Sequence, residues 1–424
     1  MLPTRAVFCY LILEARERLN SRSERAQMRR IYFDHNATTP VDREVLDAML
    51  PYLTEDFGNA SSIHSYGQRT RKAVELARDA VARLIGARAT EIVFTSGGTE
   101  SDNLAIFGVV AAAAKEEAYA GKRLHVITSK FEHSAVRNPC EVLQARGVEV
   151  TFVPVSRDGL VSPHDIRRAI RPETVLITIM HANNELGTVQ PIEEIGRLAA
   201  EADVYFHTDA VQSTGKLPID VSALGVDLLS MSGHKFHAPK GVGALYIRKG
   251  TRLEPHLFGG RHERDRRPGT ENVPGIVGLG QAAEAARARL ASDAARIAAL
   301  RDRLQTGLLA AVPQARVNCA TSPRTPNTTN ITFECTEGEA LVIALDLKGV
   351  ACSTGAACSS GVVEPSPVLT AIGMSKEEAR ATLRFSLGHA NTEEDVDYAL
   401  SVIPGVVERL RELSPLYRKP VAAQ

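Results

Sequence analysis

Lys235 is the side chain in this sequence with the clearest capacity for covalent chemistry. It ends the run Ser232-Gly233-His234-Lys235, which directly follows an apolar, strand-like segment. A lysine amine can form a Schiff base with the aldehyde of a cofactor. Lys240 competes for this role, and a solvated loop lysine is the plain alternative. The position directly after the strand, beside Ser232 and His234, favours Lys235.

The segment Ser96–Ser101, with the sequence SGGTES, has the composition of a phosphate-binding turn. Gly97 and Gly98 allow a tight backbone turn, and Thr99 opens a helix-like pattern. The backbone amides and the dipole at the N-terminus of a helix attract an anion. A capped helix after a glycine turn has the same composition, so this motif alone is a weak signal.

Polar and titratable side chains also follow the other strand-like segments. In chain order they are His133, Asn184, Asp209, Gln212, Ser232 and His234. Ligands of open α/β sheets bind at the carboxyl ends of the strands, so we expect these side chains to meet. An aspartate that pairs with the pyridine nitrogen of pyridoxal phosphate (PLP) keeps the ring electron-withdrawing. Asp209 is the candidate, and together with Lys235 and the glycine turn it predicts a PLP site.

Cys358 is the candidate nucleophile among the six cysteines. It lies in Val350–Ser366, a run so rich in Ser, Gly and Ala that we expect an exposed loop. An exposed thiol with basic neighbours can ionise and attack. A lone cysteine is more often a small buried hydrophobe, which suits Cys352 better than Cys358. No role is assigned to Cys140, Cys319 or Cys335.

Arg384 is a candidate for binding a carboxylate. It lies in the sequence TLRFSLG, which predicts a strand in the C-terminal part of the chain. The guanidinium fork matches a carboxylate through two parallel hydrogen bonds, and an amino-acid substrate presents that group. A surface ion pair is the alternative for this residue when it is taken by itself.

Short apolar, β-branched runs alternate with helical patterns from about Glu91 onward. The predicted strands are 91–95, 124–128, 148–155, 174–180, 203–209, 227–232 and 243–248. Continuous apolar runs are typical of buried parallel strands. Their alternation with helices predicts an α/β fold with a doubly wound, mostly parallel sheet.

The pattern changes after Pro274, where an Ala/Arg/Leu-rich run from Gly275 to about Val312 predicts a connecting helix. A smaller α+β set of elements follows it. We therefore expect a large domain over 31–275 and a small C-terminal domain over 276–424. The first fifteen or so residues of the large domain could pack on the small one. Residues 1–30 are expected to be an extension that is disordered or absent from the mature protein.

The composition excludes several classes of protein. Lys plus Arg and Asp plus Glu number 50 each, so no global charge favours nucleic acid or an anionic membrane. The six cysteines form no CxxC pair, which argues against a disulfide scaffold and a structural zinc site. The apolar stretch Ala6–Leu13 is too short to cross a bilayer. A cytoplasmic protein without a metal, a membrane or a nucleic-acid partner fits these observations.

These motifs together resemble the cysteine desulfurases of the NifS/IscS type, within the fold-type I PLP enzymes. The similarity extends from about Ile31 to the C-terminal helix and excludes the segment before Met28. The matching stretches are IYFDHNATTPVD, FGNASSIHSYG, TSGGTESDN, EHSAV, NNELGTVQPI, HTDAVQSTGKLPID, SGHKFHAPKGVGALYIR, GGRHERDRRPGTENV, STGAACSSGVVEPSPVL and LRFSLG. His389 departs from the pattern, because an arginine is frequent at that place.

The resemblance implies a role for each matching residue. Those that would contact PLP are Lys235, Asp209, Gln212, His133, Gly98, Thr99, Ser232, His234, Asn184 and, from the other subunit of a homodimer, Thr270. Asn184 and Arg384 would bind the substrate carboxylate. Lys235, His133 and Cys358 would be catalytic.

The activity implied by the resemblance is the removal of sulfur from L-cysteine. Alanine would be the product, and the sulfur would stay on Cys358 as a persulfide. The loop from Gly355 to Pro365 resembles the long-loop group, which hands the persulfide directly to a scaffold or sulfur-carrier protein. Iron–sulfur cluster assembly and tRNA thiolation are the expected destinations.

Two other functions compete with this interpretation. A related PLP lyase, such as a selenocysteine lyase, would need Lys235 but not Cys358. A scaffold subunit that kept the fold without activity is the non-enzyme alternative. The joint presence of Lys235, Asp209, His133, Cys358 and Arg384 argues against that alternative.

Overall fold

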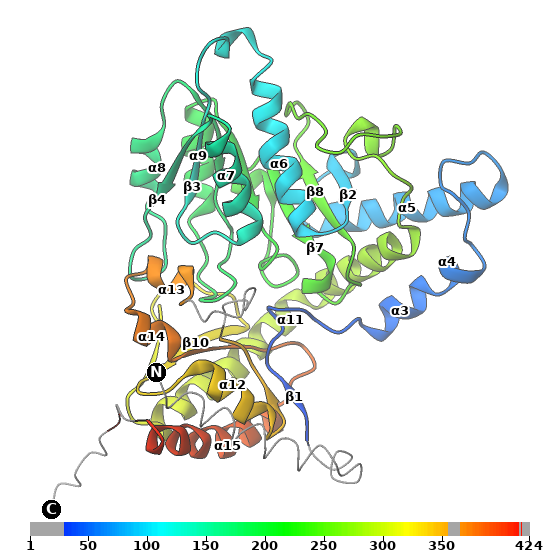
Figure 1. Ribbon diagram of the computed structural model, residues 1–424. Helices are drawn as coiled ribbons and strands as arrows, with labels where there is room; N and C mark the ends of the chain where they lie inside the picture. Colours follow the sequence, from blue (N-terminus) through cyan, green and yellow to red (C-terminus); the bar gives the residue numbers. More distant parts are fainter. Residues whose placement is uncertain (1–28, 355–364, 415–416, 418–424) are drawn as a thin grey trace, which may run out of the picture.

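A seven-stranded sheet forms the centre of the larger part of the molecule (Figure 1). The computed structural model describes residues 29–354, 365–414 and 417. The strand order is β2-β8-β7-β6-β5-β3-β4. The strands are β2 (Ile92–Thr95), β3 (His125–Ser129), β4 (Glu149–Val153), β5 (Thr174–Thr178), β6 (Tyr205–Asp209), β7 (Leu228–Ser232) and β8 (Gly243–Ile247). All seven predicted strands are present, and the predicted α/β fold is confirmed.

Helices cover both faces of this sheet, which explains why its strands are apolar throughout. One face packs on α6 (Gly98–Ala113) and α7 (Ser134–Ala145). The other face packs on α5 (Ser65–Leu84), α8 (Pro163–Ala169), α9 (Ile192–Glu201) and α10 (Val221–Leu224). Alternate residues of one strand enter the two cores: Val93 lies in the first, and Ile92 and Phe94 lie in the second.

Strand β8 departs from the expectation of parallel strands. It runs antiparallel to both of its neighbours, β7 and β2. The connection between β7 and β8 consists of residues 233–242 only. A parallel crossover needs about a dozen residues or more, so this short link forces the chain to turn back. The sheet is therefore mostly, not wholly, parallel.

A smaller layer forms the other part of the molecule, at the bottom of Figure 1. Its antiparallel sheet has the order β12-β10-β9, and α12 and α15 contribute to the same core. The bounds are β9 (Ala315–Val317), β10 (Thr328–Phe333), β12 (Thr382–Ser386), α12 (Gly338–Asp346) and α15 (Glu393–Glu412). Strand β9 was not predicted, because its three half-buried residues carry no apolar run.

The first described strand lies beside this smaller layer. Strand β1 (Ile31–Tyr32) pairs in parallel with β11 (Val350–Ala351), and Ile31 and Phe33 belong to the small core. The chain then leads through α3 (Arg43–Met49) and α4 (Pro51–Thr54) to the large part. The remaining elements are α13 (Pro367–Ala371), α14 (Lys376–Arg380) and the short 3-10 helices η1 (Ala89–Glu91), η2 (Glu117–Tyr119), η3 (Gly233–Lys235) and η4 (Glu263–Asp265).

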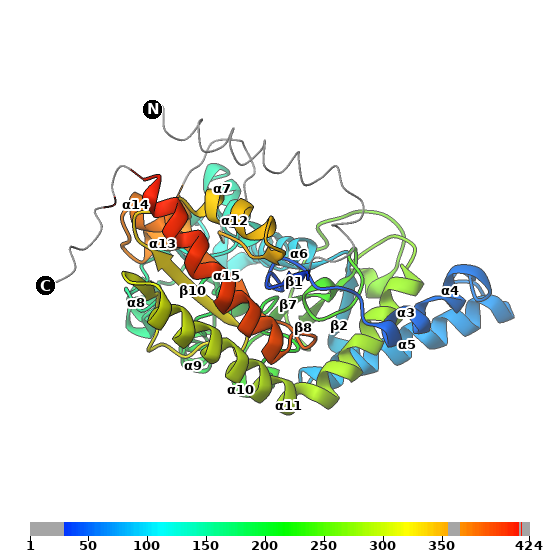
Figure 2. The same cartoon turned by 90° about the horizontal axis from the view of Figure 1, so that it is seen from below.

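Helix α11 (Val273–Ala311) belongs to both parts. Its N-terminal half packs with α5 and α3, and its C-terminal half lies along α15 and the small sheet (Figure 2). The division at residue 275 remains a prediction, since this helix crosses it without a break. The extension over 1–30 lies almost wholly outside the described residues. Among the described helices, none is both long enough and apolar enough to cross a bilayer.

Candidate active site

A cavity of about 570 Å³ lies at the carboxyl ends of the central strands. Nine of the residues singled out from the sequence line it: Gly98, Thr99, His133, Asn184, Asp209, Gln212, Ser232, His234 and Lys235. They follow β2, β3, β5, β6 and β7, so the sheet brings together residues that are far apart in the chain. The geometry supports the prediction of a ligand site at this edge.

Lys235 ends the short helix η3 and extends its amine toward the N-terminal segment of the chain. Its Nζ donates hydrogen bonds to the main-chain oxygens of Asn36 and Ala37, at 2.7 and 2.8 Å. Burial, followed by the charge of Arg384, lowers the pKa of Lys235 to about 8. An appreciable fraction of the amine is therefore neutral and nucleophilic near neutral pH. Lys240 also lines the cavity but is exposed.

Asp209 lies at the end of β6, and its carboxylate is almost completely buried. Its Oδ1 accepts a hydrogen bond from the Val211 amide at 2.9 Å. Burial raises the pKa of Asp209, while the charges of His133 and Lys235 oppose that rise. Burial and the nearby charge of Asp209 also raise the pKa of Asp102, another residue lining the cavity. A cationic partner in the cavity would stabilise the Asp209 carboxylate.

His133 is positioned by the helix that follows it. It is the N-cap residue of α7, and its Nδ1 accepts a hydrogen bond from the Ala135 amide at 3.1 Å. The neutral ring must then carry its proton on Nε2. Capping therefore fixes both the tautomer and the orientation of this side chain at the cavity wall.

The glycine turn after β2 leads into the N-terminus of α6, where the first amides have no acceptor within the helix. A Cβ at Gly98 would lie 2.7 Å from Cγ2 of Val211, so the chains approach too closely for any larger residue. Ser232 lies directly beside this turn, where a Cβ on Gly97 would be 3.6 Å from its hydroxyl, and His234 lines the same cavity. The Nδ1 of His234 lies 3.0 Å from the hydroxyl of Thr38.

Two residues without a predicted role, Lys216 and Asn36, hold Gln212 in place. Lys216 Nζ donates to Gln212 Oε1 at 2.9 Å and to Asn36 Oδ1 at 3.2 Å. Gln212 Nε2 donates to the main-chain oxygen of Asn36 at 3.0 Å. Burial, then the charges of Lys235 and Arg384, lowers the pKa of Lys216 to about 7. Lys216 lies in the matching stretch HTDAVQSTGKLPID, four residues after Gln212, and those were the sequence signals for it.

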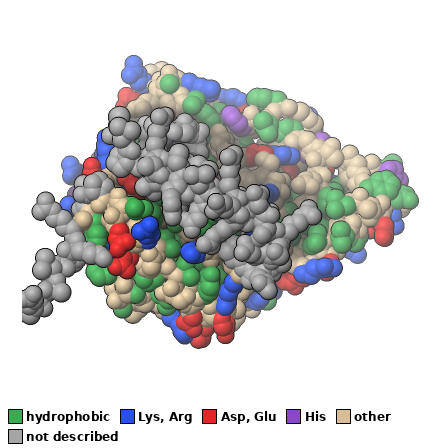
Figure 3. Space-filling view, turned by 60° about the horizontal axis from the view of Figure 1, so that its bottom comes forward, with side chains coloured by type: hydrophobic (Ala, Val, Ile, Leu, Met, Phe, Trp, Pro, Cys, Tyr) green, Lys and Arg blue, Asp and Glu red, His purple; other side chains and the backbone are tan. Residues whose placement is uncertain are grey.

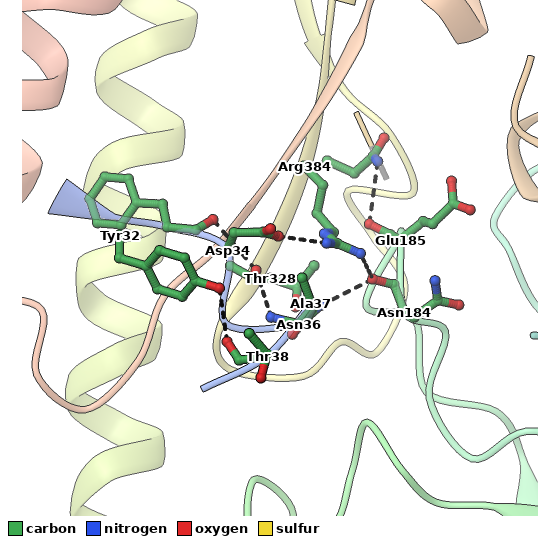
Figure 4. A network of polar contacts seen from close by, with 12 residues as sticks. Tyr32, Asp34, Asn36, Ala37, Thr38, Asn184, Glu185, Thr328 and Arg384 are labelled. Carbon is green, nitrogen blue, oxygen red and sulfur yellow. Dashed lines mark hydrogen bonds and ion pairs between the residues drawn. The ribbon is translucent and has the colours of Figure 1, made fainter. Parts of the chain in front are cut away.

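Arg384 comes to the same region from β12 but does not line the cavity itself (Figure 4). Its Nη2 donates to Asp34 Oδ1 at 2.6 Å, and its Nη1 donates to the main-chain oxygen of Asn184 at 2.8 Å. The buried Nε of Arg384 and Oδ1 of Asn184 have no hydrogen-bond partner. Asp34, which lies in a matching stretch but received no predicted role, is thus the counter-ion of Arg384.

Besides Arg384, Thr270 is a predicted site residue that does not line this cavity, and Cys358 lies outside the described residues. Thr270 is exposed. Burial raises the pKa of Cys140 and of Cys319 to about 12, and it raises that of Cys352 as well. Those three thiols are therefore poor nucleophiles. The burial of Cys352 agrees with its apolar neighbours in the sequence.

The comparison with known families decides the relationship. The sequence model of the family described as aminotransferase class V matches residues 31–399 of this chain. The chain belongs to this family. A cysteine desulfurase IscS of Methanosarcina thermophila is 53% identical over 389 residues, which cover 92% of this chain and 95% of that protein. A cysteine desulfurase IscS of Dictyoglomus turgidum is 50% identical, over 91% of this chain and 97% of the relative.

Solved structures agree with this assignment to the class-V aminotransferases. A NifS-like protein superposes with a TM-score of 0.82 at 38% identity, over 90% of this chain and 100% of that chain. SspA in complex with cysteine gives a TM-score of 0.74 at 40% identity, over 85% of this chain and 99% of that one. The predicted similarity to cysteine desulfurases of the NifS/IscS type and the fold-type I architecture are both confirmed.

Proposed function

We propose that this class-V aminotransferase family member is a PLP-dependent cysteine desulfurase that converts L-cysteine to L-alanine and leaves the sulfur on Cys358. One observation carries the proposal. The half-buried amine of Lys235, the carboxylate of Asp209 and the N-terminus of α6 line one cavity, and they are the groups that an aldehyde, a pyridine nitrogen and a phosphate require.

The residues of the cavity fit PLP. The first amides of α6 have no acceptor within the helix, and Gly98 and Thr99 at this helix start line the cavity, which suits a phosphate, with Ser232 and His234 as further contacts. Asp209 would pair with the ring nitrogen, whose positive charge would stabilise the buried carboxylate. The groups that would complete the binding of the ring are His133 on its face, Gln212 at its hydroxyl and Asn184.

When bound, PLP supplies an electron-withdrawing ring that makes the α-proton of an attached amino acid acidic. Whenever the Lys235 amine is not bonded to PLP, its lowered pKa would allow it to accept that proton near neutral pH. The carbonyl groups of Asn36 and Ala37 would hold the released amine, as they do here. His133, whose Nε2 is free of the capping hydrogen bond, would help to move protons on the same side.

Arg384 and Asn184 would bind the carboxylate of the substrate. Both have a buried polar atom without a partner, Nε in Arg384 and Oδ1 in Asn184. A carboxylate oxygen can accept a hydrogen bond from Nε, and the Asn184 amide can rotate to donate its NH₂ group. Asp34 would keep the guanidinium in position before the substrate enters.

Cys358 would take the sulfur directly. Its thiolate attacks the sulfur of L-cysteine, so that an S–S bond forms and the C–S bond of the substrate breaks. The electron pair of the broken bond returns to the carbon skeleton, which becomes alanine after protonation. The persulfide would then pass to a scaffold or sulfur-carrier protein, for iron–sulfur cluster assembly or tRNA thiolation.

The molecule would work as a homodimer in the cytoplasm. Large apolar side chains are exposed at one end of the molecule and in the loop after β8, with Ile63 91% and Phe258 88% accessible. A partner covering them could bring Thr270 to the phosphate site. The buried thiols of Cys140, Cys319 and Cys352 form no disulfide, which suits a reducing compartment.

The surface supports a protein partner more than a nucleic acid. Figure 3 shows Lys and Arg side chains interspersed with Asp and Glu on the described part of one face. A phosphate backbone would favour a continuous basic stripe instead. We therefore propose no direct nucleic-acid contact and no membrane contact.

The test is to incubate the protein with L-cysteine and a thiol reductant and to measure sulfide and alanine. The wild type should yield equal amounts of both. Cys358→Ala should lose both products while keeping the yellow colour of bound PLP. A variant that keeps its activity would show instead that Cys358 is not the sulfur acceptor and that the protein is a different PLP lyase.

A further inference from the structure

A second cavity, of about 60 Å³, lies on the other side of Lys235 from the first. It is formed where the segment before α3, the chain after η3 and the loop after β12 meet, beside the middle of α11. Three histidines line it: His35, His237 and His389. A volume of this size holds several water molecules. The sequence motifs gave no function to this group of imidazoles.

Asp42 lies in contact with two of these histidines, His389 and His237. Its Oδ1 lies 2.8 Å from His389 Nε2 and 3.4 Å from His237 Nδ1. One ligand atom from each of the three residues lies within 4.8 Å of the others. Two ligands bound about 2.1 Å from a zinc ion are at most about 4.2 Å apart, so only a small ring rotation is needed. The three side chains are 11–23% exposed.

A separate observation points to a ligand in this cavity. His35 is 3% exposed, and its Nδ1 is a buried atom without a hydrogen-bond partner. Its ring packs directly on Gly388, where a Cβ would lie 2.2 Å from the imidazole. A buried, unsatisfied nitrogen is costly unless a water or another ligand completes it. His35 lies next to His237, with ring centres 6.0 Å apart.

The charges around Asp42 leave room for a cation. Arg289 Nη2 binds the other carboxylate oxygen, Oδ2, at 2.7 Å, so Oδ1 is held toward the histidines. The same guanidinium lies 3.7 Å from Glu44 and 3.9 Å from Asp293. Arg289 is therefore shared among three carboxylates and does not neutralise Asp42 alone. A hydrogen-bonded carboxylate is also the usual condition of a metal-binding one.

We propose that Asp42, His237 and His389 form a binding site for a divalent metal ion of the zinc type, completed by water in the adjoining cavity. Two imidazoles and one carboxylate suit zinc, cobalt and nickel rather than calcium or magnesium, which prefer oxygen ligands. Binding requires the ion to displace the proton shared by His389 and Asp42, and also the proton that His237 Nδ1 donates to the main-chain oxygen of Pro40 at 3.1 Å. The ion would connect the loop after β12 to the segments before α3 and after η3.

Cobalt(II) is the probe, and the PLP-loaded protein carrying Cys358→Ser is the parent, since a reactive thiol would bind metals on its own. We expect one Co²⁺ per chain, with visible ligand-field bands and without the charge-transfer band of a cobalt–thiolate. Zn²⁺ should displace it, because zinc binds such sites more tightly. The midpoint of thermal unfolding should rise with Zn²⁺.

His237→Gln and His389→Gln, each in this parent, should weaken Co²⁺ binding at least tenfold and abolish the rise in the midpoint. His164→Gln is the matched control, because that side chain is 72% exposed and far from the cluster in the fold; it should bind Co²⁺ as the parent does. If the parent binds no stoichiometric Co²⁺, or if both glutamine variants bind it unchanged, the cluster is a hydrogen-bonded contact only and the proposal is overturned.

Discussion

Arg384 already has an anionic partner before any substrate enters the site. Asp34 accepts a hydrogen bond from Nη2 of Arg384, and the main-chain carbonyl of Asn184 accepts one from Nη1. The third nitrogen, Nε, remains available to a ligand. The positioning of the guanidinium therefore does not depend on the substrate. A pre-oriented fork loses less entropy on binding than a free arginine does.

We predict that losing Arg384 weakens L-cysteine binding more than it slows turnover. Arg384→Gln is combined with Asp34→Asn, because otherwise a half-buried carboxylate would lose its partner. Losing charge-assisted hydrogen bonds worth about 1.5–3 kcal/mol should raise KM about 10- to 100-fold. Steady-state assays of sulfide release give KM, with Asp34→Asn alone as the reference. Equal KM values for the two proteins would contradict the assigned role.

We predict that Lys216 makes the free energy of unfolding increase with pH above neutrality. Its pKa is lowered to about 7 in the folded protein, whereas an unfolded lysine keeps about 10.4. Between these values the unfolded chain binds a proton that the folded chain does not, so stability rises with pH. The slope from this residue is about 1.4 kcal/mol per pH unit, and it vanishes below pH 7.

The measurement is urea unfolding of the PLP-loaded protein at pH 7.5 and at pH 9. The increase in the free energy of unfolding from pH 7.5 to pH 9 should be smaller for Lys216→Met than for the wild type. The exposed Lys122→Met is the matched control and should follow the wild type. An unchanged pH dependence in Lys216→Met would mean that Lys216 keeps an ordinary pKa in the fold.

At the scale of elements, the first turn of α6 is fixed by its contact with the chain after β6. We expect Gly98→Ala to push Val211 away, since the new Cβ would lie 2.7 Å from it. Both the phosphate turn and the neighbouring Asp209 should then move, and PLP affinity should fall at least tenfold in an absorbance titration. Gly405→Ala, in α15 with open space around it, is the control and should bind PLP normally. Equal affinity in both would show that the turn does not hold the phosphate.

The sequence predicted most elements because apolar runs and helical periodicity are local properties. It also predicted the residues of the cavity, since strand ends gather at one edge of an α/β sheet. It missed the reversal of β8, which depends on the length of a connection, and it missed β9, which is short and half-buried. The cluster of Asp42, His237 and His389 could not be predicted, because nothing local relates three such distant positions.

At the scale of the whole molecule, the exposed apolar side chains predict a dimer. We expect the wild type to sediment as a dimer and the double variant Ile63→Asp, Phe258→Asp to shift toward monomer, because buried carboxylates at an interface are costly. The variant should also release PLP more readily if Thr270 reaches the partner's phosphate site. Leu413→Asp, at the end of α15 and 43% exposed, is the control and should remain dimeric. A wild type that sediments as a monomer would contradict the prediction.

Helix α11 connects the two parts of the molecule as one continuous, rigid element. Its 39 residues extend about 58 Å, its proline, Pro274, lies in the first turn where it does not interrupt the helix, and the same helix is embedded in both cores. Swinging the small layer as a lid would require this helix to bend and its backbone hydrogen bonds to break. The position of β12, the strand that carries Arg384, is therefore fixed relative to the cavity. Adjustment to a ligand is left to side chains and loops, and the distance between the small sheet and the strand ends of the large one is set before any ligand enters.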